Sequence, residues 1–219
     1  MRGARAAGLF LIAGGVSFIA GCFGFGGAPP PANPYLRPAV QRLGPHQVVG
    51  GAVVVSFAGV AISLEPLTPD QLEAYYQNRP GLVNPLKGLT PDGPPPIAFR
   101  VIVRNRGRQP VQIEPVTFLL TDQEDQRLRP MEYRDFYQAF SELPDADLRL
   151  RSVQATTLST FITVAPGAER DGFIFFPPPP ETSRLLVFDL GSLYLGAREA
   201  PVVAEFEVVR PRGSPARRP

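Results

Sequence analysis

The chain has 219 residues, of which 44% are hydrophobic, and it contains 27 prolines, 21 glycines, one histidine and one cysteine. This hydrophobic content is typical of a globular protein and excludes a largely disordered chain. The formal net charge is +2, but without the first 21 residues and the four arginines from residue 210 onward, 16 basic side chains remain against 20 acidic ones. Because phosphate binding needs a basic face, this balance argues against nucleic acid as a partner.

Residues 1–21 have the layout of a secretory signal peptide. Arg2 and Arg5 precede an apolar run over residues 9–20, which is shorter than the roughly 20 residues that a membrane-spanning helix needs. Small residues and then the only cysteine follow this run. The sequence therefore predicts an exported protein that has no disulfide within the chain.

Ile19, Ala20, Gly21 and Cys22 resemble the lipobox of bacterial lipoproteins. The resemblance implies that Cys22 carries fatty acyl chains such as palmitate, becomes the first residue of the mature protein and anchors it in a membrane. Phe23, in place of aspartate, resembles the signal for outer-membrane sorting. We expect the periplasmic face of the outer membrane if the organism has one, and otherwise the outer face of the plasma membrane. The alternative is a plain signal peptide followed by an incidental cysteine.

Four segments make up the predicted domain organisation. After the signal peptide, residues 22–46 are rich in glycine and then in proline and predict a tether. His46, at its end, is predicted to be a solvated linker residue, because no second histidine exists to complete a site. Residues 47–210 form the predicted body, and residues 211–219 form a basic tail that we expect to be disordered.

The body begins with β-like segments and a short helix. Alternating apolar residues predict strand structure over residues 48–67, with a bulge or turn where the alternation changes at Ala58 and Gly59. Thr68 and Pro69 are typical of an N-cap and a first helical position. We therefore expect a helix over residues 69–77, followed by a loop rich in proline and glycine over residues 80–96.

The clearest strand covers residues 97–105, where apolar side chains alternate with Arg100 and Arg104. A glycine-containing turn leads to a second strand over residues 111–121, which is interrupted at Pro115, and we expect the two strands to form a hairpin. In the last strand, Glu205 and Glu207 are expected to face away from the core. Further strands are predicted over residues 160–164, 171–176, 185–195 and 202–209.

About seven short strands separated by turns predict an antiparallel β-sandwich. The segments that carry a resemblance to immunoglobulin-like (telokin-like) domains of bacterial lipoproteins are residues 99–105, 110–111, 164–167 and 172–175. The resemblance implies an all-β, immunoglobulin-like β-sandwich of about seven strands, with one or two short helical insertions, over about residues 50–210. It also implies binding or scaffolding rather than catalysis, and it offers no family site to carry over.

Residues 122–159 form a long excursion between predicted strands, and long insertions in compact domains are usually functional or disordered. Within it, four aromatic residues at i, i+3, i+4 and i+7 form an aromatic stripe: Tyr133, Phe136, Tyr137 and Phe140. This spacing predicts an amphipathic helix over residues 132–140. We expect the excursion to form the partner-binding end of the sandwich, with the two tyrosines as anchors if they are exposed. A polar rim is expected from the charged residues Asp145, Asp147, Arg149 and Arg151. The helix over residues 69–77 is the second choice. The alternative is that the stripe packs onto the sandwich.

The sequence shows no catalytic constellation. His46 and Cys22 are unsuited to nucleophilic catalysis, and Gly-x-Ser-x-Gly and phosphate-binding glycine loops do not occur. We predict no cofactor and no metal, because zinc ligands are missing and the stretch with Asp122, Glu124 and Asp125 lacks the glycine and the closing glutamate of an EF-hand loop. The sequence therefore predicts a non-catalytic interaction or scaffolding module, anchored in the membrane through Cys22 and bound to another envelope protein. The alternative is a carbohydrate-binding module or glycan-active enzyme, which needs exposed aromatic rings and, for hydrolysis, two facing carboxylates.

Overall fold

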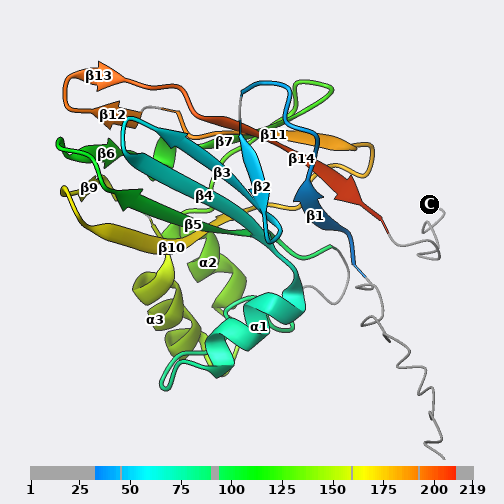
Figure 1. The fold of residues 1–219 in the computed structure, drawn as a ribbon. Coiled ribbons are helices and arrows are strands. Elements are labelled where there is room, and N and C mark those ends of the chain that lie inside the picture. The colour runs from blue at the N-terminus through cyan, green and yellow to red at the C-terminus, as the bar shows by residue number, and fades with distance from the viewer. Residues whose placement is uncertain (1–32, 45, 90–93, 159, 192, 211–219) are drawn as a thin grey trace, which may run out of the picture.

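The computed structural model describes residues 33–44, 46–89, 94–158, 160–191 and 193–210. The predicted signal peptide, the lipobox with Cys22, the first part of the tether and the basic tail lie outside these residues. The described chain is mostly β, with antiparallel strands in three sheets and three short α-helices (Figure 1). The predicted all-β class is therefore confirmed at this coarse level.

A five-stranded sheet forms the centre of the molecule. Its strands, in spatial order, are β10 (Glu169–Phe176), β5 (Ile97–Asn105), β4 (Val60–Leu67), β3 (Ala52–Phe57) and β2 (Gln47–Val49). The predicted break at Ala58 and Gly59 is the turn between β3 and β4, and both residues have positive φ, 47° and 83°. The turn is tight because glycine adopts such angles freely, and Gly59 also packs closely against the backbone of Gly107.

Two further sheets complete the β structure. The second sheet has the order β1 (Tyr35–Pro38), β14 (Val203–Val209), β11 (Leu185–Asp189), β7 (Leu119–Asp122) and β8 (Arg127–Leu128). The third has the order β13 (Arg198–Glu199), β12 (Leu193–Leu195), β6 (Val111–Ile113) and β9 (Ile162–Val164).

The predicted boundary of the tether at residue 46 is wrong, because β1 belongs to the body. β1 pairs antiparallel with β14, and Tyr35 lies opposite Val209. The following residues also dock on β14, since the Glu205 carboxylate accepts hydrogen bonds from the backbone N–H groups of Arg42 and Leu43. Glu205 is consequently only 5% exposed. The prediction that it faces away from the core into solvent is therefore wrong.

The predicted hairpin of residues 97–105 and 111–121 is also wrong. Both edges of β5 are occupied, by β4 and β10, while β6 pairs with β12 and β9. The chain changes sheets at Asn105, whose side-chain amide donates to the carbonyl oxygens of Gln109 and Val164. A 3-10 helix at Pro115–Thr117 then separates β6 from β7, at the interruption that Pro115 predicted.

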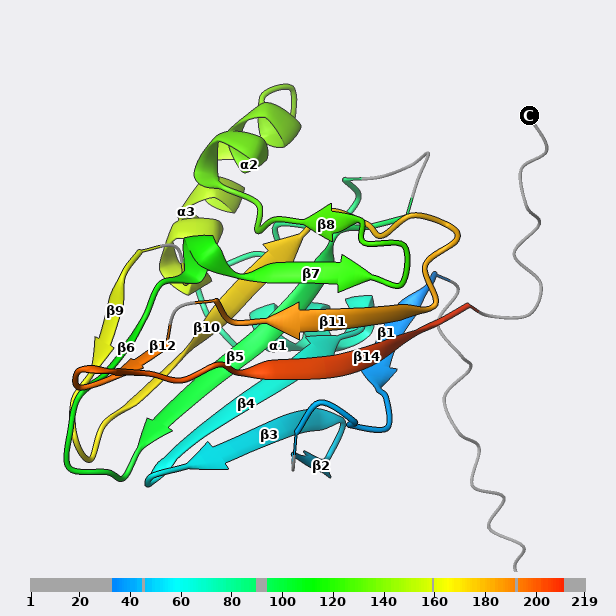
Figure 2. The same cartoon turned by 90° about the horizontal axis from the view of Figure 1, so that it is seen from above.

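The first and second sheets face each other across an aromatic core. The Phe99 ring on β5 lies 4.8 Å from that of Phe188 on β11 and 5.0 Å from that of Phe206 on β14, measured between centroids. Figure 2 shows β7, β11 and β14 lying across β10, β5 and β4. Val101 and Val103 are fully buried in this core, which confirms the inward face predicted for residues 97–105.

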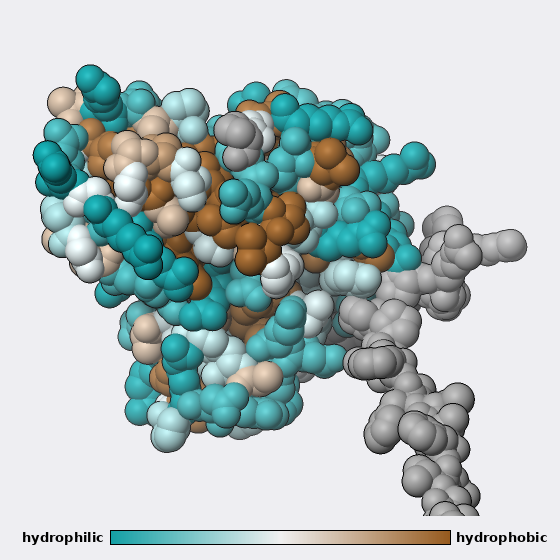
Figure 3. Space-filling model, in the orientation of Figure 1, coloured by the Kyte–Doolittle hydropathy of each residue, from teal (hydrophilic) through white to brown (hydrophobic). Residues whose placement is uncertain are grey.

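The opposite face of the central sheet is covered by a helical layer of α1 (Pro69–Gln77), α2 (Tyr133–Phe140) and α3 (Ala146–Thr156) (Figure 1). On β10, Phe173 and Phe175 pack against the helices, whereas Ile174 and Phe176 pack into the core between the sheets. The uninterrupted apolar run over residues 173–176 exists because β10 is buried on both faces. On the face of the molecule shown in Figure 3, apolar residues gather over the strands, and the helical layer below them is mainly hydrophilic.

Two of the three helices were predicted from the sequence, and the third was not. α1 and α2 occur where predicted, and Thr68 caps α1 in a capping box with Gln71. α3 was not predicted, because its buried face includes the polar residues Ser152 and Thr156 and so lacks a clear apolar stripe. Their hydroxyl groups are hydrogen-bonded to neighbouring segments, which offsets the cost of burying them.

Candidate functional site

The aromatic stripe of α2 divides into a buried half and an exposed half. Phe136 and Phe140 are fully buried, and the Phe136 ring centroid lies 5.4 Å from that of Phe175 on β10. The prediction that these two phenylalanines bind a partner is therefore wrong, because they form part of the core. Tyr133 and Tyr137 are 46% and 58% exposed, so the condition set for their role as anchors is met. We call these two residues the tyrosine pair.

The tyrosine pair lies on a helix that is stabilised by a cap at its start and by its buried face. Residues four apart are neighbours on a helix surface, so Tyr133 and Tyr137 lie on one outer face. Glu132 caps the helix start, where its backbone N–H donates to the Asp135 carboxylate at 2.8 Å. Together with the buried phenylalanines, this cap holds α2 in place without help from a partner.

Within the excursion, α2 and α3 cover a face of the central sheet. The prediction that the excursion forms an end of the sandwich is therefore wrong for these helices. The predicted charged rim is partly structural as well. The Arg149 guanidinium pairs with Asp145 at 2.8 Å and donates to the carbonyl oxygens of Pro85 and Lys87 at 3.0 and 2.6 Å. The hydrogen bond from Arg149 holds the pKa of Asp145 below its ordinary value. These two residues therefore fix a neighbouring loop instead of facing solvent freely.

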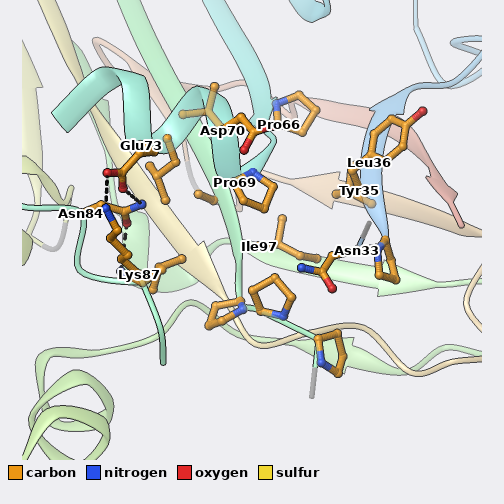
Figure 4. Close-up of a pocket in the computed structure, with 18 of the residues that line it drawn as sticks. Asn33, Tyr35, Leu36, Pro66, Pro69, Asp70, Glu73, Asn84, Lys87 and Ile97 are labelled. Atoms are coloured by element: carbon orange, nitrogen blue, oxygen red, sulfur yellow. Dashed lines mark hydrogen bonds and ion pairs between the residues drawn. The ribbon is translucent and has the colours of Figure 1, made fainter. Parts of the chain in front are cut away.

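A second candidate site is a cavity of about 560 Å³ between α1, β1 and the start of β5, which we call the chain-end pocket (Figure 4). Val208 near the end of β14 also lines it, so the first and last described strands meet there. Its apolar lining comes mainly from aliphatic side chains: Leu36, Leu67, Leu72, Leu86, Ile97 and Val208. Prolines from four separate segments complete the wall: Pro34, Pro66, Pro69, Pro94, Pro95, Pro96 and Pro179.

One end of the chain-end pocket is polar. The Glu73 carboxylate accepts hydrogen bonds from Lys87 at 2.7 Å, from Asn84 at 3.0 Å and from Gln77 at 3.2 Å (Figure 4). The hydrogen bonds from Lys87 and then Asn84 lower the pKa of Glu73 below its ordinary value. Asp70 lies one turn earlier on α1 and lines the same pocket. A glycosidase acid needs a raised pKa, so Glu73 has the wrong shift for that role.

The loop that forms one wall of this pocket is held by two helices. Glu73 of α1 binds Asn84 and Lys87, and Arg149 of α3 binds the loop carbonyl groups. In addition, the Ser152 hydroxyl accepts a hydrogen bond from the Val83 backbone N–H at 2.9 Å. The pocket wall is therefore preformed, as is usual for small-ligand sites. Sequence reasoning missed this pocket, because its lining comes from segments far apart in the chain.

The remaining predicted residues give no further site. Cys22 and the other lipobox residues lie outside the described residues. His46, predicted to be solvated, is half-buried, and its backbone N–H donates to the Gly44 carbonyl at 2.8 Å. Within the described ranges, no three His, Cys, Asp or Glu side chains gather in a way that could hold a metal ion. In this same part of the chain, no helix has the length and apolar character needed to cross a membrane.

Comparisons with known proteins add little. No protein-family model matches the chain, and no characterised protein sequence matches it either. Among solved structures, the yjhA protein from Bacillus subtilis is similar at a TM-score of 0.33 and 12% sequence identity, over 63% of this chain and 76% of that one. A likeness at this TM-score carries no argument about fold or function.

Proposed function

We propose that this protein is a lipid-anchored envelope lipoprotein whose body is a non-catalytic protein-interaction module. Its signal peptide would be removed before Cys22, and the acylated cysteine would hold the body at the membrane. We further propose that the facing sheets are an immunoglobulin-like sandwich. The lipobox residues support the anchor, and the packing of Phe99 against Phe188 and Phe206 is compatible with the sandwich.

The observation that carries the interaction role is the tyrosine pair. Tyrosine supplies a large contact area and a hydrogen bond at low conformational cost, and it is enriched among the residues that dominate binding energy. The side chains of Tyr133 and Tyr137 are exposed to solvent, while Phe136 and Phe140 on the same helix are buried in the core. α2 also lies well away from the point where β1 enters the body (Figures 1 and 2). A partner could therefore reach this face while the body remains tethered.

The anchor is tested by Cys22→Ser. We expect the variant to lose a fatty-acid label and to move from the membrane fraction to the soluble envelope fraction. Membrane retention with an unchanged label would overturn the anchor.

The docking face is tested by Tyr137→Ala, with crosslinking in the native envelope. We expect the crosslinked partner to be lost while the stability of the body changes by no more than about 0.5 kcal/mol, as is usual for surface substitutions. Phe161→Ala is the matched control, because Phe161 is an aromatic residue with a similar exposure of 55% on another part of the surface. An unchanged crosslink in Tyr137→Ala would remove the tyrosine pair as the docking face.

Carbohydrate binding is the second candidate, because exposed aromatic rings can also stack on sugar rings. The Tyr137→Ala variant distinguishes carbohydrate binding from protein docking when glycan binding is measured beside crosslinking. Retention of the purified protein on envelope glycan, lost in Tyr137→Ala and unaccompanied by a crosslinked protein, would favour that function over protein docking.

A further inference from the structure

We propose that the chain-end pocket takes up one acyl chain of the lipid on Cys22 and shields it from water when the anchor is outside a bilayer. The inference rests on the proposed function in one respect, namely that Cys22 is acylated. It assigns a ligand class, a long hydrocarbon chain with an uncharged attachment, to a pocket that the docking role does not use.

The lining of the pocket suits hydrocarbon. Its volume of about 560 Å³ lies within the range of about 300–1,000 Å³ that is usual for small-ligand pockets. Leucine, isoleucine, valine and proline side chains dominate the wall, and Tyr35 is the one aromatic residue among the described lining residues. A sugar would need stacking rings, whereas an acyl chain needs only apolar surface, and each methylene removed from water contributes about 0.8 kcal/mol.

The position of the pocket places it within reach of the chain's own lipid. Asn33, where the described chain begins, already lines the pocket. Ten residues, 23–32, separate it from Cys22, and a chain of this length spans at most about 40 Å. A ligand joined by so short a connection has an effective concentration on the order of millimolar. An acyl chain on Cys22 would therefore outcompete dilute free lipids for the pocket.

The charge of the pocket lining selects against free lipids that are anionic. Lys87 is the one cationic side chain among the described lining residues, and its ammonium group is paired with Glu73. Asp70 also lines the pocket, so its described lining carries two carboxylates against one ammonium group. A fatty acid or an anionic phospholipid would bring its negative charge to an already negative rim. Thioether and amide linkages on a lipidated cysteine carry no charge and avoid this repulsion.

The first test uses the full chain as Cys22→Ser, which cannot be acylated. The probes are parinaric acid, whose fluorescence rises on burial, and its uncharged methyl ester. We expect saturable binding with one site, and several-fold tighter binding of the ester than of the acid. Absence of ester binding, or a preference for the acid, would overturn the proposal.

Two substitutions locate the binding. Leu67→Gln and Val208→Gln each place an amide in the pocket wall from a half-buried position on a different strand. We expect both to weaken ester binding by about tenfold or more, corresponding to about 1.4 kcal/mol. Val40→Gln is the control, since Val40 is 77% exposed and does not line the pocket. Melting curves identify any variant that fails to fold, and unchanged binding in a folded pocket variant contradicts the proposal.

The last test separates the chain's own lipid from a free one. Because Cys22 is the only cysteine, N-hexadecyl iodoacetamide attaches a single long chain there through an uncharged linkage. We expect this adduct to exclude the ester probe, whereas the adduct of plain iodoacetamide binds it normally. Equal probe binding by both adducts would show that the pocket serves free lipid. These results do not depend on acylation in the cell, so the anchor is refuted separately if the fatty-acid label and the membrane retention are unchanged in Cys22→Ser.

Discussion

The Tyr76 hydroxyl on α1 and the Thr156 hydroxyl on α3 lie 2.7 Å apart in the interior of the helical layer. Thr156 donates its own proton to the Ser152 carbonyl at 2.7 Å, so Tyr76 is the donor to Thr156. Burial raises the pKa of Tyr76, which keeps the phenol protonated and able to donate. This hydrogen bond is a direct polar link between the two helices, and it joins residues that are 80 positions apart in the chain.

The two partners of this bond should differ in their effect on stability. Tyr76→Phe removes the donor and leaves Thr156 bonded to Ser152, so we expect a loss of about 1 kcal/mol. Thr156→Val leaves the buried tyrosine hydroxyl without an acceptor, and we expect a loss of about 1–3 kcal/mol. Urea denaturation measures both. The double variant should be less destabilised than the sum of the singles, and strict additivity would show that the bond contributes nothing.

Val101→Asp should unfold the body. Val101 is fully buried on β5, and an unpaired buried charge costs several kcal/mol against a total stability of about 5–15 kcal/mol. Ser56→Asp is the control, because Ser56 is exposed on the neighbouring strand β3 and should tolerate the charge. Circular dichroism and thermal melting distinguish the two. Similar melting temperatures in both variants would show that the inward face of the sheet is misassigned.

Glu73 should make stability depend on pH. Its pKa in the folded protein is lowered from the ordinary value of 4.5 by Lys87 and Asn84, so its contribution is fully present above that value. This contribution is lost as the pH falls through the folded-state pKa. The stability difference between the wild type and Glu73→Gln should therefore stay constant well above pH 4.5 and shrink as the pH falls below this value. A difference that stays constant in urea titrations across this range would contradict the assignment.

Glu205 should control the docking of the segment that precedes β2. Its carboxylate accepts the backbone N–H groups of Arg42 and Leu43, and Gln41 adds hydrogen bonds to the backbone of Glu205. Glu205→Ala should therefore increase hydrogen exchange at the amides of residues 42 and 43. β5 does not contact this segment through hydrogen bonds, so its amides serve as the internal reference. Unchanged exchange at residues 42 and 43 would refute the role.

Local sequence patterns predicted the elements that depend on local physics. Thr68 and Pro69 predicted the start of α1, because an N-cap and a proline at the first turn satisfy the helix end through neighbouring atoms. The alternation around Val101 and Val103 predicted their burial, since side chains on a strand point alternately to opposite faces. The spacing of the aromatic stripe likewise predicted α2.

Strand pairing and side-chain exposure were decided only by the tertiary structure. Two strands joined by a turn form a hairpin only if their edges are free, and β4 and β10 occupy both edges of β5. Helical spacing placed Phe136 and Tyr137 on neighbouring positions of α2, but only the packing of β10 buries one and leaves the other exposed. The chain-end pocket depends on the same long-range assembly, because segments from Asn33 to Val208 must meet before its apolar wall exists.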